Sequence, residues 1–194
     1  MMRYWLIALF SSLLLTPTAF AQSSAELDKG EIFVSTQSVK GYDFPRLVVR
    51  AVVDAPPQKV FEIVGNCDRF KDRLPRVKKS RILKKSAASY TCTVTIGVPF
   101  PMSDLIAVTV DRRRLGPEVW ERKWTLASGA ETSYTRNVGG FTLSPFKGNP
   151  NRTLVHYEIH AIPKSAVPDF VRKSAQKRSL PGMIKRIRKE VAKL

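Results

Sequence analysis

Histidine and glutamate alternate in the segment His156-x-Glu158-x-His160, a pattern that could bind a metal ion. On a β-strand these three side chains would share one face. Imidazole and carboxylate groups are zinc ligands, but ligands on one flat face diverge, and no fourth ligand is evident. We therefore interpret them as a solvated outer face and predict no metal site. The neighbouring residues would then face the interior: Val155, Tyr157 and Ile159.

A second alternating group, Trp120, Arg122 and Trp124, combines a guanidinium with two indoles. The guanidinium could stack on an indole or meet an anionic head group. If this face points outward, the tryptophans suit a membrane interface instead. We favour simple packing, in which the stem of Arg122 is buried and its charge reaches solvent.

Motifs of covalent catalysis and phosphate binding do not occur: there is no Gly-x-Ser-x-Gly segment and no Gly-rich phosphate loop. A reaction in the interior would need a buried titratable group, and the candidates are Asp104, Tyr134 and Tyr157. A tyrosine in an apolar pocket is usually a hydrogen-bonded wall residue. We expect no cofactor and favour a binding protein over an enzyme.

The segments that carry these residues have the two-residue period of β-strands. Short turns separate them, and Gly139-Gly140 is expected to form a bulge or bend. Between the second and third strands the pattern becomes helical, which predicts two short helices at residues 55–66 and 67–75. The strands are predicted at residues 30–39, 44–55, 80–85, 89–98, 104–114, 118–128, 132–146 and 152–162.

The chain after Pro163 is predicted to form a long amphipathic helix. Pro181-Gly182 should kink this helix or restart it, with Ser179 as the N-cap. Its apolar stripe has the spacing of a core-facing side: Leu180, Met183, Ile184, Ile187, Val191 and Leu194. Much of the remainder is basic: Lys185, Arg186, Arg188, Lys189 and Lys193. We interpret the stripe as the cover of the sheet's apolar face, and the cations as a surface that faces a membrane.

The first residues have the features of a bacterial signal peptide. Arg3 precedes a short apolar run, and Ala19-Phe20-Ala21 fits a cleavage site before Gln22. An uncleaved anchor is the alternative, but the run is short for a membrane span. We predict a signal peptide over residues 1–21, a single domain over residues 22–194, and a periplasmic location.

Basic residues outnumber acidic ones, 33 to 16, which gives a net charge of +17. Two runs, residues 68–85 and 167–194, are especially basic. Such a surface attracts anionic partners. Because export argues against intracellular DNA or RNA, we expect an anionic membrane and no nucleic acid.

Two cysteines, Cys67 and Cys92, are available for one disulfide, which an oxidising compartment permits. Sequence alone does not place them near each other. We favour two isolated thiols over a bridge.

Three segments, in order, resemble START-like domains within the wider polyketide-cyclase and lipid-transport group. The first is VRAVVDAPPQKVFEIVGNCDRFKDRLPRVKKSRIL, and the second is VPFPMSDLIAVTVDRR. The third runs from Gly139 to Lys189, with a Gly-Gly-aromatic strand, a Val-x-Tyr strand and a Leu-Pro within the last helix. The likeness covers roughly residues 45–190. Where the family often has an Arg-Asp pair after Ser-Asp, this chain has Leu105 and Ile106, which indicates a drier pocket or a different polar anchor.

The resemblance implies an α+β helix-grip fold, in which a curved antiparallel β-sheet wraps around a long C-terminal α-helix and encloses an apolar tunnel. It also implies a hydrophobic ligand. We expect a monomeric periplasmic carrier of a lipid or another hydrophobic small molecule; the alternatives are an aromatase or cyclase using the same tunnel and an electrostatic binder of acidic polymers. The expected ligand-binding residues are Val94, Ile96, Trp120, Arg122, Trp124, Phe141, Tyr157, Phe170, Met183 and Ile187.

Overall fold

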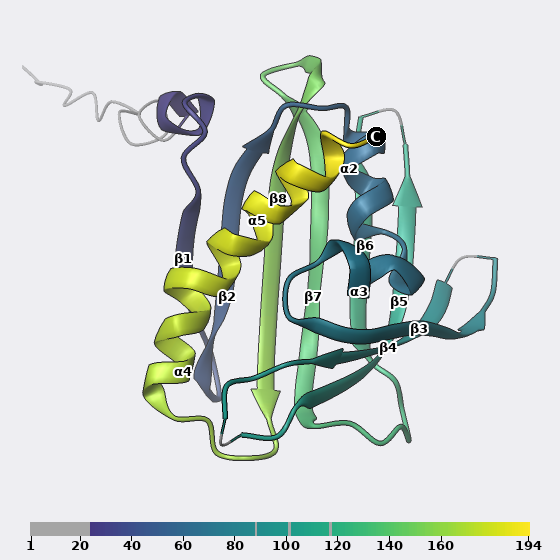
Figure 1. The fold of residues 1–194 in the computed structure, drawn as a ribbon, viewed down its shortest axis with the longest axis vertical. Coiled ribbons are helices and arrows are strands. Elements are labelled where there is room, and N and C mark those ends of the chain that lie inside the picture. Colours follow the sequence, from purple (N-terminus) through teal and green to yellow (C-terminus); the bar gives the residue numbers. More distant parts are fainter. Residues whose placement is uncertain (1–23, 88, 101, 117) are drawn as a thin grey trace, which may run out of the picture.

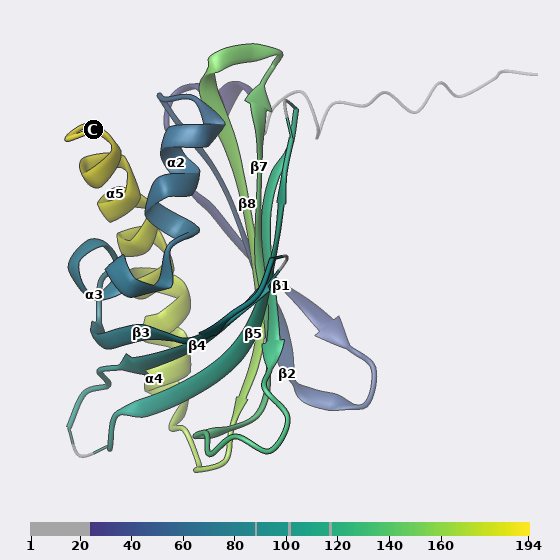
Figure 2. The ribbon, with the colours of Figure 1, turned by 90° about the vertical axis from the view of Figure 1, so that its right-hand side faces the viewer.

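The computed structural model describes residues 24–87, 89–100, 102–116 and 118–194, which form one curved antiparallel sheet with helices on its concave side (Figures 1 and 2). The strand order is β1-β2-β8-β7-β6-β5-β4-β3, so β3 to β8 form a meander and the β1–β2 hairpin pairs with β8. This confirms the predicted α+β helix-grip fold. The strands are β1 (Phe33–Val39), β2 (Tyr42–Val53), β3 (Val77–Lys85), β4 (Ser89–Ile96), β5 (Leu105–Leu115), β6 (Trp120–Leu126), β7 (Tyr134–Phe146) and β8 (Asn149–Pro163).

The two short helical segments predicted between β2 and β3 are present. They are α2 (Pro57–Val64), followed by a 3₁₀ turn, η1 (Cys67–Arg69), and by α3 (Phe70–Arg73). Pro57 occupies the first turn of α2, where its missing N–H costs no hydrogen bond. The buried side of α2 packs into the main core with strands β2, β7 and β8 and with the terminal helix.

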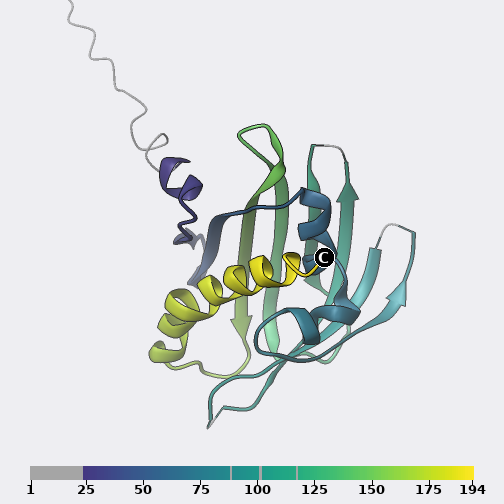
Figure 3. The same cartoon turned by 45° about the horizontal axis from the view of Figure 1, so that its top comes forward.

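The terminal helix is continuous, and the predicted restart at Ser179 is wrong. Helix α4 (Asp169–Ser174) continues through a π-helical turn, η2 (Ala175–Ser179), into α5 (Leu180–Val191). The combined helix crosses the concave face of the sheet diagonally (Figure 3). Ser179 has helical dihedrals, φ −70° and ψ −43°, and makes no capping hydrogen bond. Pro181 lacks an N–H and would clash with the carbonyl four residues earlier in a regular helix. The wider π turn just before it relieves that conflict.

The apolar stripe of α5 lies where it was predicted except at Leu194, which is beyond the end of the helix, and the cations of α5 are less free than predicted. Leu180, Ile184, Ile187 and Val191 are buried, Met183 is half-buried, and Leu194 is exposed. Several cations are engaged within the fold. Arg188 donates to the carbonyl oxygens of Val52 and Gly30 at 2.8 and 2.9 Å, and Glu190 pairs with Arg186 and Lys193 at 3.0 and 2.6 Å. Lys185 and Lys189 remain exposed.

Cys67 and Cys92 form a disulfide, so the prediction of isolated thiols is wrong. Their Cα atoms lie 6.1 Å apart although 25 residues separate them in sequence. The fold makes the contact because η1 lies over the inward face of β4. Phe70 and Tyr90 pack around the bridge in a small buried cluster. The disulfide therefore fastens the η1–α3 segment to the sheet.

Gly139 and Gly140 lie in a regular part of β7, and the predicted bulge or bend is absent from the β7–β8 pairing between Arg136 and Pro145. A Cβ at Gly139 would come within 2.6 Å of the Trp124 ring and 2.4 Å of the Glu158 carbonyl oxygen. The glycine is needed for this close approach rather than for a bend. The turn after β7 is a tight turn at Lys147-Gly148, both with positive φ, as in type I′ hairpins.

The outer face of β8 is only partly solvated, which corrects the interpretation of its His-x-Glu-x-His pattern. His160 is fully buried, with the Tyr42 ring edge-on at 5.0 Å. Arg136 Nε donates to His160 Nδ1 at 2.8 Å, so Nε2 carries the proton and donates to the Phe44 carbonyl oxygen at 2.9 Å. Glu158 pairs with Arg46 at 3.3 Å. Within the described residues, no three metal-binding side chains gather.

The predicted signal peptide, residues 1–21, lies outside the described residues. In the part of the chain that the structure describes, no helix combines the length and the apolar character needed to cross a bilayer.

Candidate ligand-binding tunnel

Two adjoining cavities lie between the concave face of the sheet and the terminal helix. The inner cavity has a volume of about 370 Å³ and the outer cavity about 390 Å³. Each is in the size range of small-molecule sites. We refer to the two cavities together as the tunnel. They share six lining residues, which we call the waist: Arg76, Ile96, Tyr157, Ile159, Ser179 and Leu180.

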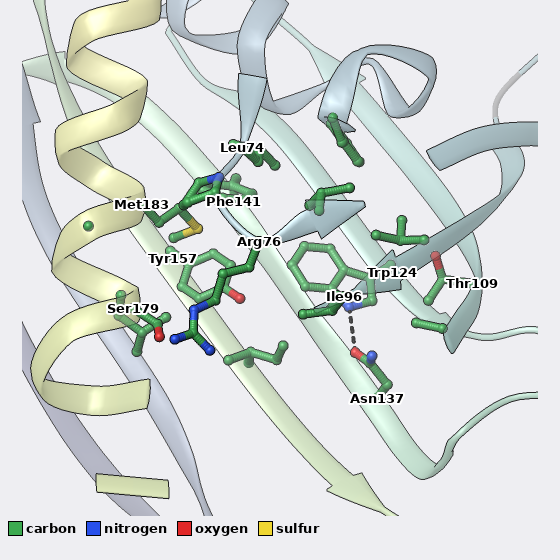
Figure 4. A pocket seen from close by; sticks show the side chains of 18 of the residues that line it. Leu74, Arg76, Ile96, Thr109, Trp124, Asn137, Phe141, Tyr157, Ser179 and Met183 are labelled. Atoms are coloured by element: carbon green, nitrogen blue, oxygen red, sulfur yellow. Dashed lines mark hydrogen bonds between the residues drawn. The ribbon is translucent and has the colours of Figure 1, made fainter. Parts of the chain in front are cut away.

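The inner cavity has a mostly apolar wall built by alternate residues of neighbouring strands. Trp124 of β6, Phe141 of β7 and Tyr157 of β8 stack across the strands, with ring centroids 4.6 to 6.2 Å apart. The Trp124 indole N–H donates to the side-chain oxygen of Asn137 at 2.9 Å, so its polar group is satisfied (Figure 4). Met183 of α5 closes the opposite side. This wall can accept apolar ligand surface without leaving its own polar groups unpaired.

A buried ion pair forms the inner end of the tunnel. Arg122 Nε donates to Asp111 Oδ2 at 2.6 Å, and Thr109 Oγ1 donates to Asp111 Oδ1 at 2.5 Å. The Arg122 guanidinium lies 4.5 Å from the Phe70 ring centroid and 4.6 Å from that of Trp124. The predicted snorkelling of Arg122 is therefore wrong, because its charge is neutralised inside the protein.

Asp111 is a residue of the site that sequence reasoning missed. It lies on the inward face of β5 with Ala107 and Thr109, opposite Trp124 in the β5–β6 ladder. Hydrophobic patterning misleads here because the other face of β5, with Val108 and Val110, is the more apolar one. The register of the β5–β6 hairpin would have been the signal, because it places Asp111 directly opposite the inward-facing Trp124. Asp111 and Arg122 therefore place a paired internal charge at the inner end of the tunnel.

Two tyrosine hydroxyls that face the tunnel have no hydrogen-bond partner among the described residues. Tyr157 at the waist is 7% exposed and Tyr134 in the outer cavity is 6% exposed. Neither hydroxyl has a hydrogen bond to another described residue. Every fully buried side-chain nitrogen or oxygen in the described chain has a partner, so these hydroxyls are open to the cavity. Burial raises the pKa of Tyr134 to about 12 and also raises that of Tyr157, which makes both neutral hydrogen-bond donors.

The outer cavity opens between α4 and the β4–β5 loop. Val98, Pro99 and Met102 of the loop face Phe170 and Val171 of α4 across this mouth. Phe170 is 62% exposed, and Phe100 at the tip of the loop is 93% exposed. Two exposed phenylalanines thus lie outside the core, Phe170 in the lining of the outer cavity and Phe100 next to Pro99 of that lining.

The tunnel contains eight of the ten predicted residues. Trp120 is not among them, because it packs on Phe61 of α2 at 5.4 Å between ring centroids. Ile187 is also outside, fully buried in the core. Asp104, a catalytic candidate, lies outside the tunnel and pairs with Lys78 at 2.9 Å. Those in the tunnel are Val94, Ile96, Arg122, Trp124, Phe141, Tyr157, Phe170 and Met183.

A curved sheet that grips a terminal helix over an apolar tunnel is the architecture of the START-like class. Residues 53–188 match the family described as polyketide cyclase / dehydrase and lipid transport, and the chain belongs to this family. No curated protein matches the chain in sequence.

Solved structures of similar fold include lipid-transfer proteins and a cyclase. A STAR-related lipid transfer protein from Xanthomonas axonopodis is 18% identical, with a TM-score of 0.71 over 83% of this chain and 93% of that one. Human StAR-related lipid transfer protein 5 is 13% identical, with a TM-score of 0.69 over 92% and 99%. The Zhui aromatase/cyclase from Streptomyces sp. R1128 is 15% identical, with a TM-score of 0.51 over 76% and 95%. At these identities the likeness establishes the fold alone.

Proposed function

We propose that this protein binds a hydrophobic ligand, a lipid, in the tunnel and carries it between membranes or enzymes of the periplasm. The observation that supports this most is the pair of adjoining, mostly apolar cavities of about 370 and 390 Å³. Burial of apolar ligand surface there would contribute about 25 cal/mol per Å² before the costs of binding. The family, which includes lipid transport proteins, supports the same function.

The mouth is the proposed membrane-docking end. Phe100 and Phe170 are exposed beside it. Two exposed lysines are also near: Lys164 follows Pro163, and Lys173 precedes Ser174, and both of these neighbours line the outer cavity. Aromatic groups insert at the interface of a bilayer, and lysines near an anionic surface each contribute about 1 kcal/mol. The basic side of α5 is a weaker candidate for this role, because Arg186 and Arg188 already donate hydrogen bonds to the backbone carbonyl oxygens of Asp72 and Val52.

Export to the periplasm is part of the proposal. The signal-peptide pattern of residues 1–21 supports it, and so does the Cys67–Cys92 disulfide, because such bonds persist in oxidising compartments. Intact-mass measurement of protein from a periplasmic fraction should give a chain that begins at Gln22 and lacks two thiol hydrogens. A chain that retains residues 1–21 would contradict cleavage.

A cyclase-type enzyme is the second candidate, favoured by the unpartnered hydroxyls of Tyr134 and Tyr157 in the tunnel. The raised pKa values of these tyrosines make them poor proton donors in a reaction at neutral pH. The same hydroxyls can bind a ligand through hydrogen bonds without any reaction. We therefore place ligand binding first.

Ligand content is the decisive test of the proposed function. The protein would be purified without detergent, and its extract analysed by mass spectrometry beside that of the Met183→Lys variant. Wild type should retain a stoichiometric apolar compound, and the variant should lose it because a charge would enter the inner cavity. Met183→Leu, which keeps the volume apolar, is the matched control. Wild type that carries no lipid and accepts none from vesicles would refute the proposal.

A further inference from the structure

The waist of the tunnel has a cation that the binding of an apolar chain does not require. The Arg76 side chain lines both cavities. It has no hydrogen bond or ion pair with any other described residue. Figure 4 shows its guanidinium between the Tyr157 ring and Ser179, pointing into the tunnel. A guanidinium in this position is available to a ligand.

The backbone at Arg76 is unfavourable for an arginine. Its φ is 63°, in the left-handed region that glycine and asparagine adopt more easily. The Arg76 carbonyl accepts a hydrogen bond from the Gly97 N–H at 2.8 Å, which holds the residue at the start of β3. Non-glycine residues kept in this conformation are concentrated at functional sites. The strain is therefore a second, independent observation that the side chain has a role.

Other polar groups at and beside the waist suit the same kind of ligand. Tyr157 is 7% exposed, and its hydroxyl lacks a partner among the described residues and faces the cavity. Ser179 belongs to the waist, and the exposed Arg178 lines the inner cavity next to it. The described linings of both cavities contain no aspartate or glutamate. Cations and hydrogen-bond donors with no carboxylate beside them favour an anionic ligand.

We propose that the waist is an anion subsite and that the natural ligand is an amphiphile with one carboxylate or phosphate group. Arg76 binds this group, the Tyr157 hydroxyl donates a hydrogen bond to it, and Arg178 adds positive potential. Apolar chains extend from it into the inner and outer cavities. This inference rests on the proposed lipid-binding function and names its ligand class.

The test compares ligands that differ only in their head group. Hexadecanol, palmitate and hexadecyl phosphate would each displace a neutral fluorescent apolar probe from wild type, Arg76→Gln and Arg81→Gln. Arg81 is the matched control because it is an exposed arginine of β3 outside both cavities. Wild type should prefer the anionic ligands over the alcohol by about tenfold or more. Arg76→Gln should remove most of this preference, and Arg81→Gln should keep it.

Three outcomes would overturn the inference in distinguishable ways. Equal affinity for alcohol and anions in wild type, or an Arg76→Gln effect that is the same for all three ligands, would remove the anion subsite and leave the lipid-binding function intact. Failure of the neutral probe and of every ligand to bind would refute the proposed function itself. Displacement of palmitate by inorganic phosphate at equal concentration would show a site for free anions instead of a lipid head group. Arg76→Lys should retain part of the preference, and thermal melting would verify that each variant is folded.

Discussion

Arg122 and Arg76 line the same tunnel in opposite electrostatic situations. Arg122 is 6% exposed, lies 2.6 Å from Asp111 and is enclosed by the rings of Phe70 and Trp124. Arg76 is exposed, has no partner for its side chain among the described residues and has a strained backbone. The first arginine has its contacts within the fold, whereas the second lacks them.

This difference separates an architectural charge from a ligand-binding one. A buried charge must be paired, because the desolvation of a lone ion costs several kcal/mol. The Arg122–Asp111 pair satisfies that condition and fixes the inner end of the tunnel. Arg76 is near enough to water to remain solvated when the tunnel is empty, so its contact with a ligand can be made and broken. Substitutions at the two arginines should therefore have opposite effects on stability and on binding.

The largest effect is expected from breaking the inner pair. Arg122→Met would leave the fully buried Asp111 carboxylate without its cation and lower the free energy of unfolding by about 3–5 kcal/mol. Urea denaturation measures this change. Arg122→Met combined with Asp111→Asn should recover most of it, because no charge is then buried alone. A single variant as stable as wild type would show that Arg122 is not the architectural charge we describe.

The disulfide should have the next largest effect, since it holds the segment that covers Arg122. Phe70 follows η1 directly and stacks on the guanidinium. Replacing both Cys67 and Cys92 with alanine releases a loop of 25 residues and should cost about 3 kcal/mol in the chain-entropy description. Denaturation with and without a reductant would measure this loss in wild type, and the double variant should not respond to the reductant. Stability unaffected by reduction would contradict a structural role for the bridge.

Most of the fold could be predicted from the sequence, but the contrast between Arg122 and Arg76 could be predicted only in part. Period-two segments and an amphipathic helix give the sheet, its cover and the inward positions of Tyr157 and Met183, because burial enforces those periods. Cys67 with Cys92 and Arg122 with Asp111 depend on which strands and helices meet, which periodicity does not encode. Arg76 is one basic residue in the run 68–85. Only its backbone conformation and its place between two cavities distinguish it from its neighbours.

His160 offers a smaller test of the rule that buried polar groups are paired. Burial lowers the pKa of His160, with the positive charges of Arg136 and Arg46 acting in the same direction. Its folded pKa is thus below the unfolded value of about 6.5, so the unfolded state binds the proton first as the pH falls. Stability should be retained above pH 6.5 and decrease as the pH falls below it. Thermal melting between pH 7.5 and 5.5, about one unit either side of that value, would measure this.

His160→Gln is the control for that pH dependence. Glutamine keeps one donor and one acceptor for Phe44 and Arg136 but does not titrate. The variant should lose the part of the acid destabilisation that His160 causes. An unchanged pH profile would assign the effect to other groups.

The smallest effect on stability, and the sharpest contrast with Arg122, is expected at Arg76. Arg76→Gly removes the unfavourable left-handed arginine and should raise the free energy of unfolding by about 0.5–1 kcal/mol. The matched variant Arg81→Gly, in the regular strand β3, should lower it by a similar amount because glycine weakens a strand. Arg76→Gly should at the same time lose the preference for palmitate over hexadecanol. A residue kept for stability would show the reverse, a less stable protein with unchanged ligand selectivity, and that result would place Arg76 with Arg122 among the architectural charges.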